Sequence, residues 1–258
     1  MKDQETIHTL REFLKDDIRR RTDFSRTDQS LGHPMPAVEK PLAKGQQARP
    51  LPAWQGAVRL SHDLAALIAN RQSVRKYQPG GLSAEELSFL LWATQGVRRA
   101  KGERVLRTVP SAGNRHPFET YLALTQPSAA RDGQVFEAGI WRYLPLSHAL
   151  VLLGSPANLP DLVAEAALGQ TFVGLAPATF VWSAVPYRTE WRYREASHKV
   201  IAIDAGHLCQ NLYLAAEAAG LGTCAVAAYD QPAADQLLGL DGKDEFVVYM
   251  APVGRARG

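Results

Sequence analysis

The sequence predicts an α+β fold, in which helices and strands are mixed along the chain. Three observations favour this class. Apolar residues recur at helical spacing in several segments, the longest over residues 198–219. Other segments are continuously apolar or alternate as strands do. These segments follow one another without the regular βα repeat of a doubly wound sheet, which leaves α+β as the best class.

The first sixty residues differ from the rest. Residues 6–21 predict a short amphipathic helix whose apolar positions follow helical spacing. The stretch that follows is rich in Pro, Gly and polar residues and has no periodicity, so we expect an extended segment that wraps over a surface. The expected organisation is an N-terminal extension over residues 1–60 and one folded domain over residues 61–258.

Regular elements begin near residue 61. Residues 63–70 predict a helix, and Ser83 with Glu86 forms a capping-box pattern that opens another. The later expected elements are strands over 118–125 and 135–143, a helix over 159–168, a strand over 178–185, the helix over 198–219, a strand over 223–229, a helix over 232–238 and a strand over 245–253.

The helix over 198–219 carries the strongest pattern. Ile201, Ala205, Leu208 and Leu212 begin one apolar stripe, and Gly220 is placed to end the helix. Gly206 inside it costs about 1 kcal/mol relative to alanine. That cost indicates close approach by another backbone, with simple tolerance in a long, well-packed helix as the alternative.

Composition excludes several classes of protein. Hydrophobic residues are 46% and charged residues 21% of the 258 residues, close to a globular average. The net charge of +3 and the absence of a Lys/Arg run argue against a nucleic-acid partner. Cys209 and Cys224 are too few for a disulfide scaffold or a zinc site. Asp204, His207 and Asn211 share a helix face but lack further ligands, so we expect no metal.

The same reading favours a cytoplasmic protein with a small-molecule substrate. The charged N-terminus has no apolar signal-peptide core. The longest uncharged stretch, residues 166–187, is interrupted by Gly and Pro, so we expect a loop leading into a buried strand rather than a membrane span.

Two basic stretches could hold a phosphate. Arg71, Ser73 and Arg75 alternate, and in an extended segment alternate side chains point the same way. Planar guanidinium groups donate two hydrogen bonds at once to a phosphate. Arg255 and Arg257 alternate in the same way near the C-terminus and could complete the site. A solvated basic surface is the alternative for both.

Two further stretches could contact a flat ligand. Residues 110–117, PSAGNRHP, predict a rigid loop in which Asn114 can donate to and accept from a ring edge. The alternative is a structural turn with His116 at the surface. Residues 220–230 hold a row of small side chains that allow close contact between main chain and ligand, although a packed strand looks similar.

These four stretches, in this order, resemble the nitroreductase superfamily of FMN-dependent enzymes. The resemblance spans about residues 61–257 and is closest to the SagB-type dehydrogenase branch, which includes azoline (thiazoline and oxazoline) dehydrogenases of peptide pathways. The segment DAGHLCQNLYLAAEAAGLG at 204–222 is its specific part. The resemblance implies a nitroreductase-like fold with a central mixed or antiparallel sheet flanked by helices, in an intertwined homodimer with FMN at the subunit interface.

The resemblance also implies roles for individual residues. Arg71, Ser73 and Arg75 would hold the FMN phosphate, helped by Arg255 or Arg257. The loop would approach the flavin from the partner subunit, and the main chain near two alanines would face flavin N5. The implied cofactor-contacting residues of these two segments are Pro110, Ser111, Ala112, Gly113 and Asn114, with Ala227 and Ala228.

One departure from the branch concerns catalysis. Azoline dehydrogenases of this branch carry a Lys-Tyr pair where this chain has Arg192 and Tyr193. Arginine is a poor general base because its pKa exceeds about 12. We take Arg192 and Tyr193 as the candidate catalytic residues. The alternative is that they only shape the substrate pocket.

Three activities are therefore expected in order. The first is an FMN-dependent oxidoreductase that passes a hydride or two electrons from NAD(P)H through flavin N5 to a nitroaromatic, a quinone or a similar flat acceptor. The second is a SagB-type azoline dehydrogenase acting on a peptide. The third is a flavin-binding module with little turnover.

Overall fold

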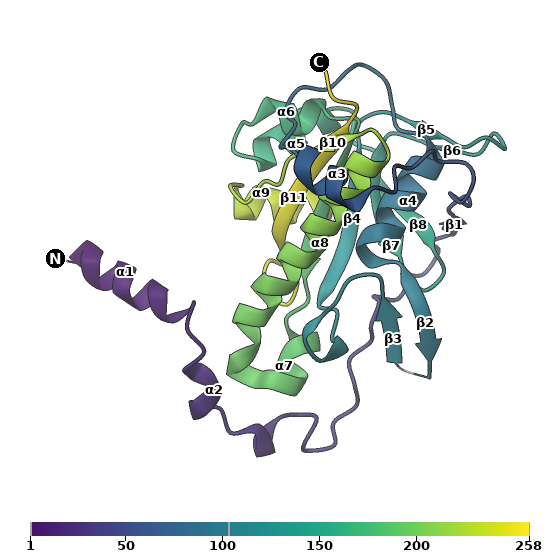
Figure 1. Ribbon diagram of the computed structural model, residues 1–258. Coiled ribbons are helices and arrows are strands. Elements are labelled where there is room, and N and C mark those ends of the chain that lie inside the picture. The colour runs from purple at the N-terminus through teal and green to yellow at the C-terminus, as the bar shows by residue number, and fades with distance from the viewer. Residues whose placement is uncertain (1, 103, 258) are drawn as a thin grey trace.

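A seven-stranded sheet forms the centre of the computed structural model, which describes residues 2–102 and 104–257 (Figure 1). The strand order is β1-β8-β7-β4-β9-β11-β10, and each neighbouring pair is antiparallel. The strands are β1 (Ala48–Pro50), β4 (Phe118–Leu124), β7 (Gly139–Leu144), β8 (Ala149–Gly154), β9 (Ala178–Ala184), β10 (Gly222–Thr223) and β11 (Phe246–Gly254). Two small ribbons pair β2 (Val97–Lys101) with β3 (Arg104–Arg107) and β5 (Ser128–Ala129) with β6 (Val135–Phe136).

Helices cover both faces of this sheet. Helices α4 (Ala84–Gln95) and α8 (His198–Ala218) pack on one face, and α5 (Leu159–Ala166), α6 (Thr171–Leu175) and α9 (Gln231–Leu238) pack on the other. The remaining helices are α1 (Lys2–Glu12), α2 (Ile18–Arg21), α3 (Leu64–Asn70) and α7 (Tyr187–Tyr193), with single turns η1 (Phe24–Arg26), η2 (Ala112–Asn114) and η3 (Arg194–Ser197). The arrangement confirms the expected α+β class with an antiparallel sheet flanked by helices.

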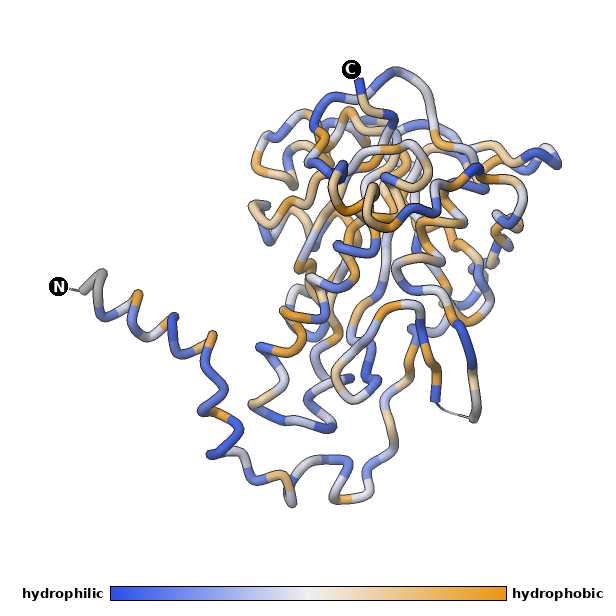
Figure 2. Tube along the Cα trace, in the orientation of Figure 1, coloured by the Kyte–Doolittle hydropathy of each residue, from blue (hydrophilic) through white to orange (hydrophobic). Residues whose placement is uncertain are grey.

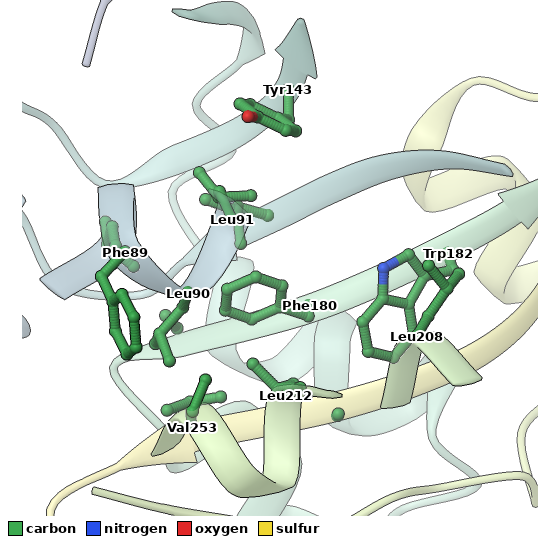
Figure 3. Packing of buried hydrophobic residues seen from close by; sticks show 14 of the residues in the cluster. Phe89, Leu90, Leu91, Tyr143, Phe180, Trp182, Leu208, Leu212 and Val253 are labelled. Carbon is green, nitrogen blue, oxygen red and sulfur yellow. The ribbon is translucent and has the colours of Figure 1, made fainter. Parts of the chain in front are cut away.

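Strand β9 contributes side chains to the hydrophobic cores on both faces of the sheet. Because successive side chains of a strand point to opposite faces, Phe180 and Trp182 join the core under α4 and α8, whereas Val181 joins the core under α5 and α9. Figure 3 shows Leu208 and Leu212 of α8 packed over these two aromatic rings. The tube in Figure 2 is accordingly most apolar at the centre of the molecule. Burying each large apolar side chain contributes about 1.5–3 kcal/mol.

The predicted ends of two helices are confirmed. Ser83 accepts from the Glu86 N–H at 3.1 Å and Glu86 accepts from the Ser83 N–H at 2.8 Å, which is a complete capping box at the start of α4. Helix α8 ends just before Gly220, which has a φ of +69°. Glycine reaches that left-handed conformation without the steric cost that a Cβ brings.

Two predicted strands are wrong in extent. The single strand expected over 135–143 is divided into β6 and β7, which pair with different partners. The strand expected over 223–229 is regular only in β10, because the Ala225 N–H donates to the Tyr213 hydroxyl at 2.8 Å instead of to a neighbouring strand. The sequence patterns also missed β1, β2, β3 and β8.

The helix expected over residues 6–21 is also wrong in extent, since α1 ends at Glu12 and α2 begins at Ile18. Helix α1 stands away from the rest of the chain in Figure 1. Its apolar stripe is therefore uncovered: Ile7 is 49% and Leu10 66% exposed.

Residues 38–41 are held firmly against the sheet by buried charged side chains. Arg107 Nη2 donates to the Val38 carbonyl at 2.6 Å, and Arg142 Nη1 donates to the Lys40 carbonyl at 2.8 Å. The Lys40 N–H donates to Glu119 at 2.9 Å. Both arginines and Glu119 are buried, so this part of the N-terminal segment supplies acceptors that buried guanidinium groups require.

The uncharged stretch 166–187 forms α6 and β9 within the fold. Among the described helices, none combines the length and the apolar character that crossing a membrane requires.

Candidate active site

The Arg71–Arg75 segment leaves α3 and runs beside β10. The Val74 N–H donates to the Thr223 carbonyl at 2.9 Å, and Ser73 bridges to Thr223 in parallel register. This pairing holds the segment extended. The alternation predicted from the sequence therefore places Arg71, Ser73 and Arg75 on one side.

Tyr213 of α8 organises two of these three side chains. The Arg71 guanidinium lies 5.2 Å from the centre of the Tyr213 ring, and Ser73 Oγ lies 3.0 Å from its hydroxyl. Because the Tyr213 oxygen already accepts from the Ala225 N–H, its own proton can go to Ser73. The Ser73 hydroxyl is then free to donate to a ligand. Arg75 is exposed beside them, and no described carboxylate pairs with it or with Arg71.

The two C-terminal arginines lie beside the same segment but differ in their partners. The Arg257 N–H donates to the Lys76 carbonyl at 3.0 Å, which brings the chain end alongside. Arg255 directs its guanidinium to both Glu86 oxygens, at 2.9 and 3.1 Å. Arg255 therefore forms an ion pair with Glu86 in the first turn of α4, whereas Arg257 is exposed and forms no ion pair with a described residue.

An apolar cavity of about 440 Å³ lies along the same side of α8. Small side chains of α8, Ala202 and Gly206, form one wall, and Ala227 and Tyr249 form part of the opposite wall. Ala227 thus lies where a flat apolar ligand could rest. Ala228 does not line the cavity, and its carbonyl accepts from Gln170 at 2.9 Å.

The loop 110–117 is anchored to the other side of α8 by Asp204. Ser111 Oγ donates to the Asp204 carboxylate at 2.6 Å and the Ala112 N–H donates to it at 3.1 Å. The same serine oxygen accepts from the His116 N–H at 2.8 Å. Asp204 is 4% exposed, and burial raises the pKa of its carboxyl group. Pro110, by contrast, is exposed at the edge of the loop.

His116 fixes the orientation of Asn114. His116 is 3% exposed, so the alternative of a surface histidine is wrong. Burial, with Arg107 and Arg115 close by, lowers the pKa of His116 to about 3, which keeps the ring neutral. Its Nε2–H donates to Asn114 Oδ1 at 2.9 Å, because a carbonyl oxygen can only accept. The Asn114 amide NH₂ is thereby left free to donate to a ligand.

The candidate catalytic pair lies against this loop. Arg192 Nε donates to the Tyr193 hydroxyl at 3.2 Å at the end of α7. Gly113 has a φ of +58°, and a Cβ there would lie 2.8 Å from Arg192 Cδ and would also meet the Tyr193 hydroxyl. Glycine therefore lets the loop and the pair touch.

The two groups of candidate residues lie on opposite sides of α8. Asp204 and Tyr213 are nine residues apart, which is two and a half turns and about 14 Å along the axis. Arg71 and Ser73 therefore lie at one edge of the helix, and the loop that carries Asn114 lies at the other edge. Between them α8 exposes a face in which a Cβ at Gly206 would meet no described atom within 4 Å.

Comparison with known proteins decides the family. The model of the nitroreductase family matches residues 68–255. The chain belongs to the nitroreductase family. A protein of Methanocaldococcus jannaschii with the provisional name nitroreductase MJ1384 is 33% identical over 192 residues, which are 74% of this chain and 90% of that protein. A solved structure from Ralstonia eutropha, also provisionally named a nitroreductase, is 28% identical with a TM-score of 0.63, and the alignment covers 85% of this chain and 99% of that one.

One relative with a different name is the trifolitoxin-processing protein TfxB of Rhizobium leguminosarum. It is 31% identical over 125 residues, which are 47% of this chain and 32% of TfxB. Similarity to this nitroreductase-family chain therefore extends to a trifolitoxin-processing protein, although over a minority of its length.

Three contributors to this nitroreductase-family site were not predicted from the sequence. Tyr213 was part of the quoted family segment but carried no role. Asp204 was considered only as a metal ligand, and His116 only as a surface residue. The capacity of Asp204 to anchor a loop more than ninety positions earlier in the chain becomes visible only once the fold brings the two together.

Proposed function

We propose that this protein is an FMN-dependent oxidoreductase that carries electrons from NAD(P)H to a flat organic acceptor such as a nitroaromatic or a quinone. The observation that carries the proposal is that Arg71 and Arg75, two positions before and after Ser73 in an extended segment, have no described carboxylate partner. A phosphate monoester offers the charge and the acceptor oxygens that these donors lack. Arg257, rather than Arg255, is available to assist.

The apolar cavity beside α8 fits the rest of the cofactor. Its small side chains at Ala202, Gly206 and Ala227 allow a flat ring system to approach the main chain. It lies on the same side of α8 as Tyr213, since Gly206 and Tyr213 are seven residues, or about two turns, apart. One ligand could therefore place its phosphate by Arg71 and its ring in the cavity.

The opposite placement of the loop supports a homodimer. A second chain packed on the exposed face of α8 would bring its own Asn114 toward the first chain's cavity, whereas the first chain's Asn114 does not line that cavity. A small residue at Gly206 suits such a close helix–helix contact. Each cofactor site would then consist of a cavity from one subunit and a loop from its partner.

Bound FMN supplies the redox chemistry, a hydride taken from NAD(P)H and two electrons delivered to the acceptor. The chain's own residues bind and orient. Asn114, held by His116, presents amide donors to a ring edge, and Arg192 supplies positive charge near the loop. This reaction requires no side chain to act as an acid or base.

An absorption spectrum of the purified protein tests the proposal. We expect a yellow protein that releases FMN on denaturation and bleaches when NADH or NADPH is added without oxygen. Colourless protein that cannot be reconstituted with FMN would reject it. Persistent yellow colour with both donors would favour a flavin-binding module with little turnover or a dehydrogenase whose electrons come from its own substrate.

A SagB-type azoline dehydrogenase is the second candidate. The relationship to TfxB and the position of the Tyr193 hydroxyl, beside the loop and 3.2 Å from Arg192, favour it. Arg192 weakens it, since a guanidinium that stays protonated does not remove a proton. The test is oxygen-dependent conversion of a thiazoline peptide to the thiazole without NAD(P)H. Mass spectrometry detects this conversion as the loss of two mass units. An unchanged peptide mass would exclude this activity for that substrate.

A further inference from the structure

A polar cavity of about 630 Å³ lies behind the loop 110–117, separate from the proposed FMN cavity. Besides the loop itself, three parts of the chain enclose it: the N-terminal segment with His33, strand β3 with Arg104, and α7 with Trp191 and Arg192. Asn114 reaches its edge. The volume falls within the range of about 300–1,000 Å³ that small-molecule sites occupy.

The charge of this cavity is one-sided. Arg104, Arg115 and Arg192 all line it, and none of the described lining residues is an aspartate or a glutamate. None of the three arginines forms an ion pair with a described residue. Like charges that share a partly enclosed site repel one another, so the arrangement is stabilised when an anion enters.

Arg115 is the buried member of this group. It is 5% exposed, its Nε donates to the Arg188 carbonyl at 2.9 Å, and its guanidinium lies 4.7 Å from the centre of the Trp191 ring. Its Nη2 is shielded from water and has no hydrogen-bond partner among the described residues. Burial lowers the pKa of Arg115, and the nearby charge of Arg192 lowers it further. A buried donor without an acceptor is costly, and an anion beside the guanidinium would reduce that cost.

We propose that this cavity binds the carboxylate of a planar substrate, with Arg104, Arg115 and Arg192 as its anchors. The planar fork of a guanidinium matches a carboxylate in shape and donates to both oxygens. Trp191, whose ring centre lies 4.7 Å from the Arg115 guanidinium, supports that guanidinium in the cavity wall. The proposal deepens the proposed function, on which its substrate role rests: a carboxylate held here leaves the other end of the molecule at Asn114, on the loop expected to face the flavin.

Direct binding tests the proposal without turnover. Isothermal titration of the purified protein with 4-nitrobenzoate and with the neutral 4-nitrobenzamide compares the same ring with and without the charge. We expect the carboxylate to bind about tenfold or more tightly. Arg104→Gln and Arg192→Gln, at positions that are not fully buried, should each remove most of that preference. Arg131→Gln, an exposed arginine outside this cavity, should leave it unchanged.

Several outcomes overturn the proposal. Equal affinity for the two probes does so, as does an equal loss in Arg131→Gln. Sodium phosphate that binds as tightly as 4-nitrobenzoate would assign the cavity to free anions instead of a planar carboxylate. FMN content measured on the same preparations separates the two proposals. FMN-loaded protein without the preference refutes only the carboxylate site, and FMN-free protein with the preference refutes only the flavin function.

Discussion

The Asp204 carboxylate on α8 holds Ser111, ninety-three positions earlier in the chain, by a hydrogen bond of 2.6 Å. The contact fixes the loop that carries Asn114 to the helix at the centre of the fold. Asp204→Asn replaces one of the two accepting oxygens by a donor. We expect a loss of about 1–3 kcal/mol in the free energy of unfolding, measured by urea titration. A double-mutant cycle with Ser111→Ala should return a coupling of about 0.5–3 kcal/mol, and strict additivity would contradict a direct interaction.

Arg71→Ala should weaken FMN binding while the chain remains folded. A hydrogen bond to a charged phosphate contributes about 1.5–3 kcal/mol, which corresponds to roughly a 10- to 150-fold loss in affinity. Flavin fluorescence on dilution measures the dissociation constant. Tyr213→Phe is the companion variant, since it keeps the ring under Arg71 but removes the hydroxyl that orients Ser73. Wild-type FMN affinity in Arg71→Ala would refute the assignment.

The two C-terminal arginines should separate in their effects. Arg257→Ala should lower FMN affinity because its guanidinium is free to reach the phosphate. Arg255→Ala should chiefly lower stability, by at most about 1 kcal/mol, because that guanidinium is half-exposed and pairs with Glu86. Thermal melts and FMN titration on both variants give the comparison. The reverse pattern would show that Arg255 exchanges Glu86 for the ligand.

His116 should make stability depend on pH. Its pKa falls from an ordinary 6.5 to about 3 in the folded chain. Between those pH values only the unfolded chain binds the proton, which favours unfolding. The contribution of the neutral His116 ring to the free energy of unfolding is therefore fully present above pH 6.5 and is lost as the pH falls toward 3. His116→Gln keeps a donor for Asn114 but cannot titrate. Urea titrations from pH 7 down to about 4 should give a flatter profile in the variant. Its remaining slope comes partly from His148, whose pKa burial also lowers. Identical slopes would show that His116 does not titrate differently in the two states.

Gly206→Leu should disrupt the proposed dimer without unfolding the chain. Leucine improves helix propensity by about 1 kcal/mol, and within one chain a Cβ at this position has open space. Across a close helix–helix contact the same side chain would collide. Light scattering should therefore report a smaller species. FMN retention should fall as well, partly because Gly206 also lines the apolar cavity, so the mass is the deciding measurement. Glu165→Leu on α5, on the opposite face of the sheet, is the control for an added apolar side chain. A Gly206→Leu protein of unchanged mass would remove α8 from the interface.

Sequence patterns predicted the elements whose periodicity is long. Helix α8 and the capping box at Ser83 were found because several residues agree on one face or one terminus. Strand β8 was missed because ALVLLG, Ala149–Gly154, is an apolar run that fits a helix as readily as a strand. The β2–β3 ribbon was missed because its sequence is rich in basic residues, although β3 buries Val105 and Arg107 and Arg107 hydrogen-bonds to Gln95.

In the candidate site too, local motifs identified some residues and the fold was needed to identify the others. Arg71, Ser73 and the loop around Asn114 could be named from local motifs, because each motif lies within a few residues. The partners that fix them could not. Arg255 and Arg257 look equivalent in the sequence, and only the position of Glu86, at the start of α4, distinguishes them. The arginine-lined cavity joins segments about 160 residues apart, His33 to Arg192, which no local pattern relates.

The hold of Arg142 on the Lys40 carbonyl spans 102 residues of chain. During synthesis at about 5–20 residues per second, the N-terminal segment leaves the ribosome several seconds before the arginine that secures it exists. Residues 38–41 can therefore make this contact only after Arg142 has been synthesised, and chaperones have that interval in which to hold them.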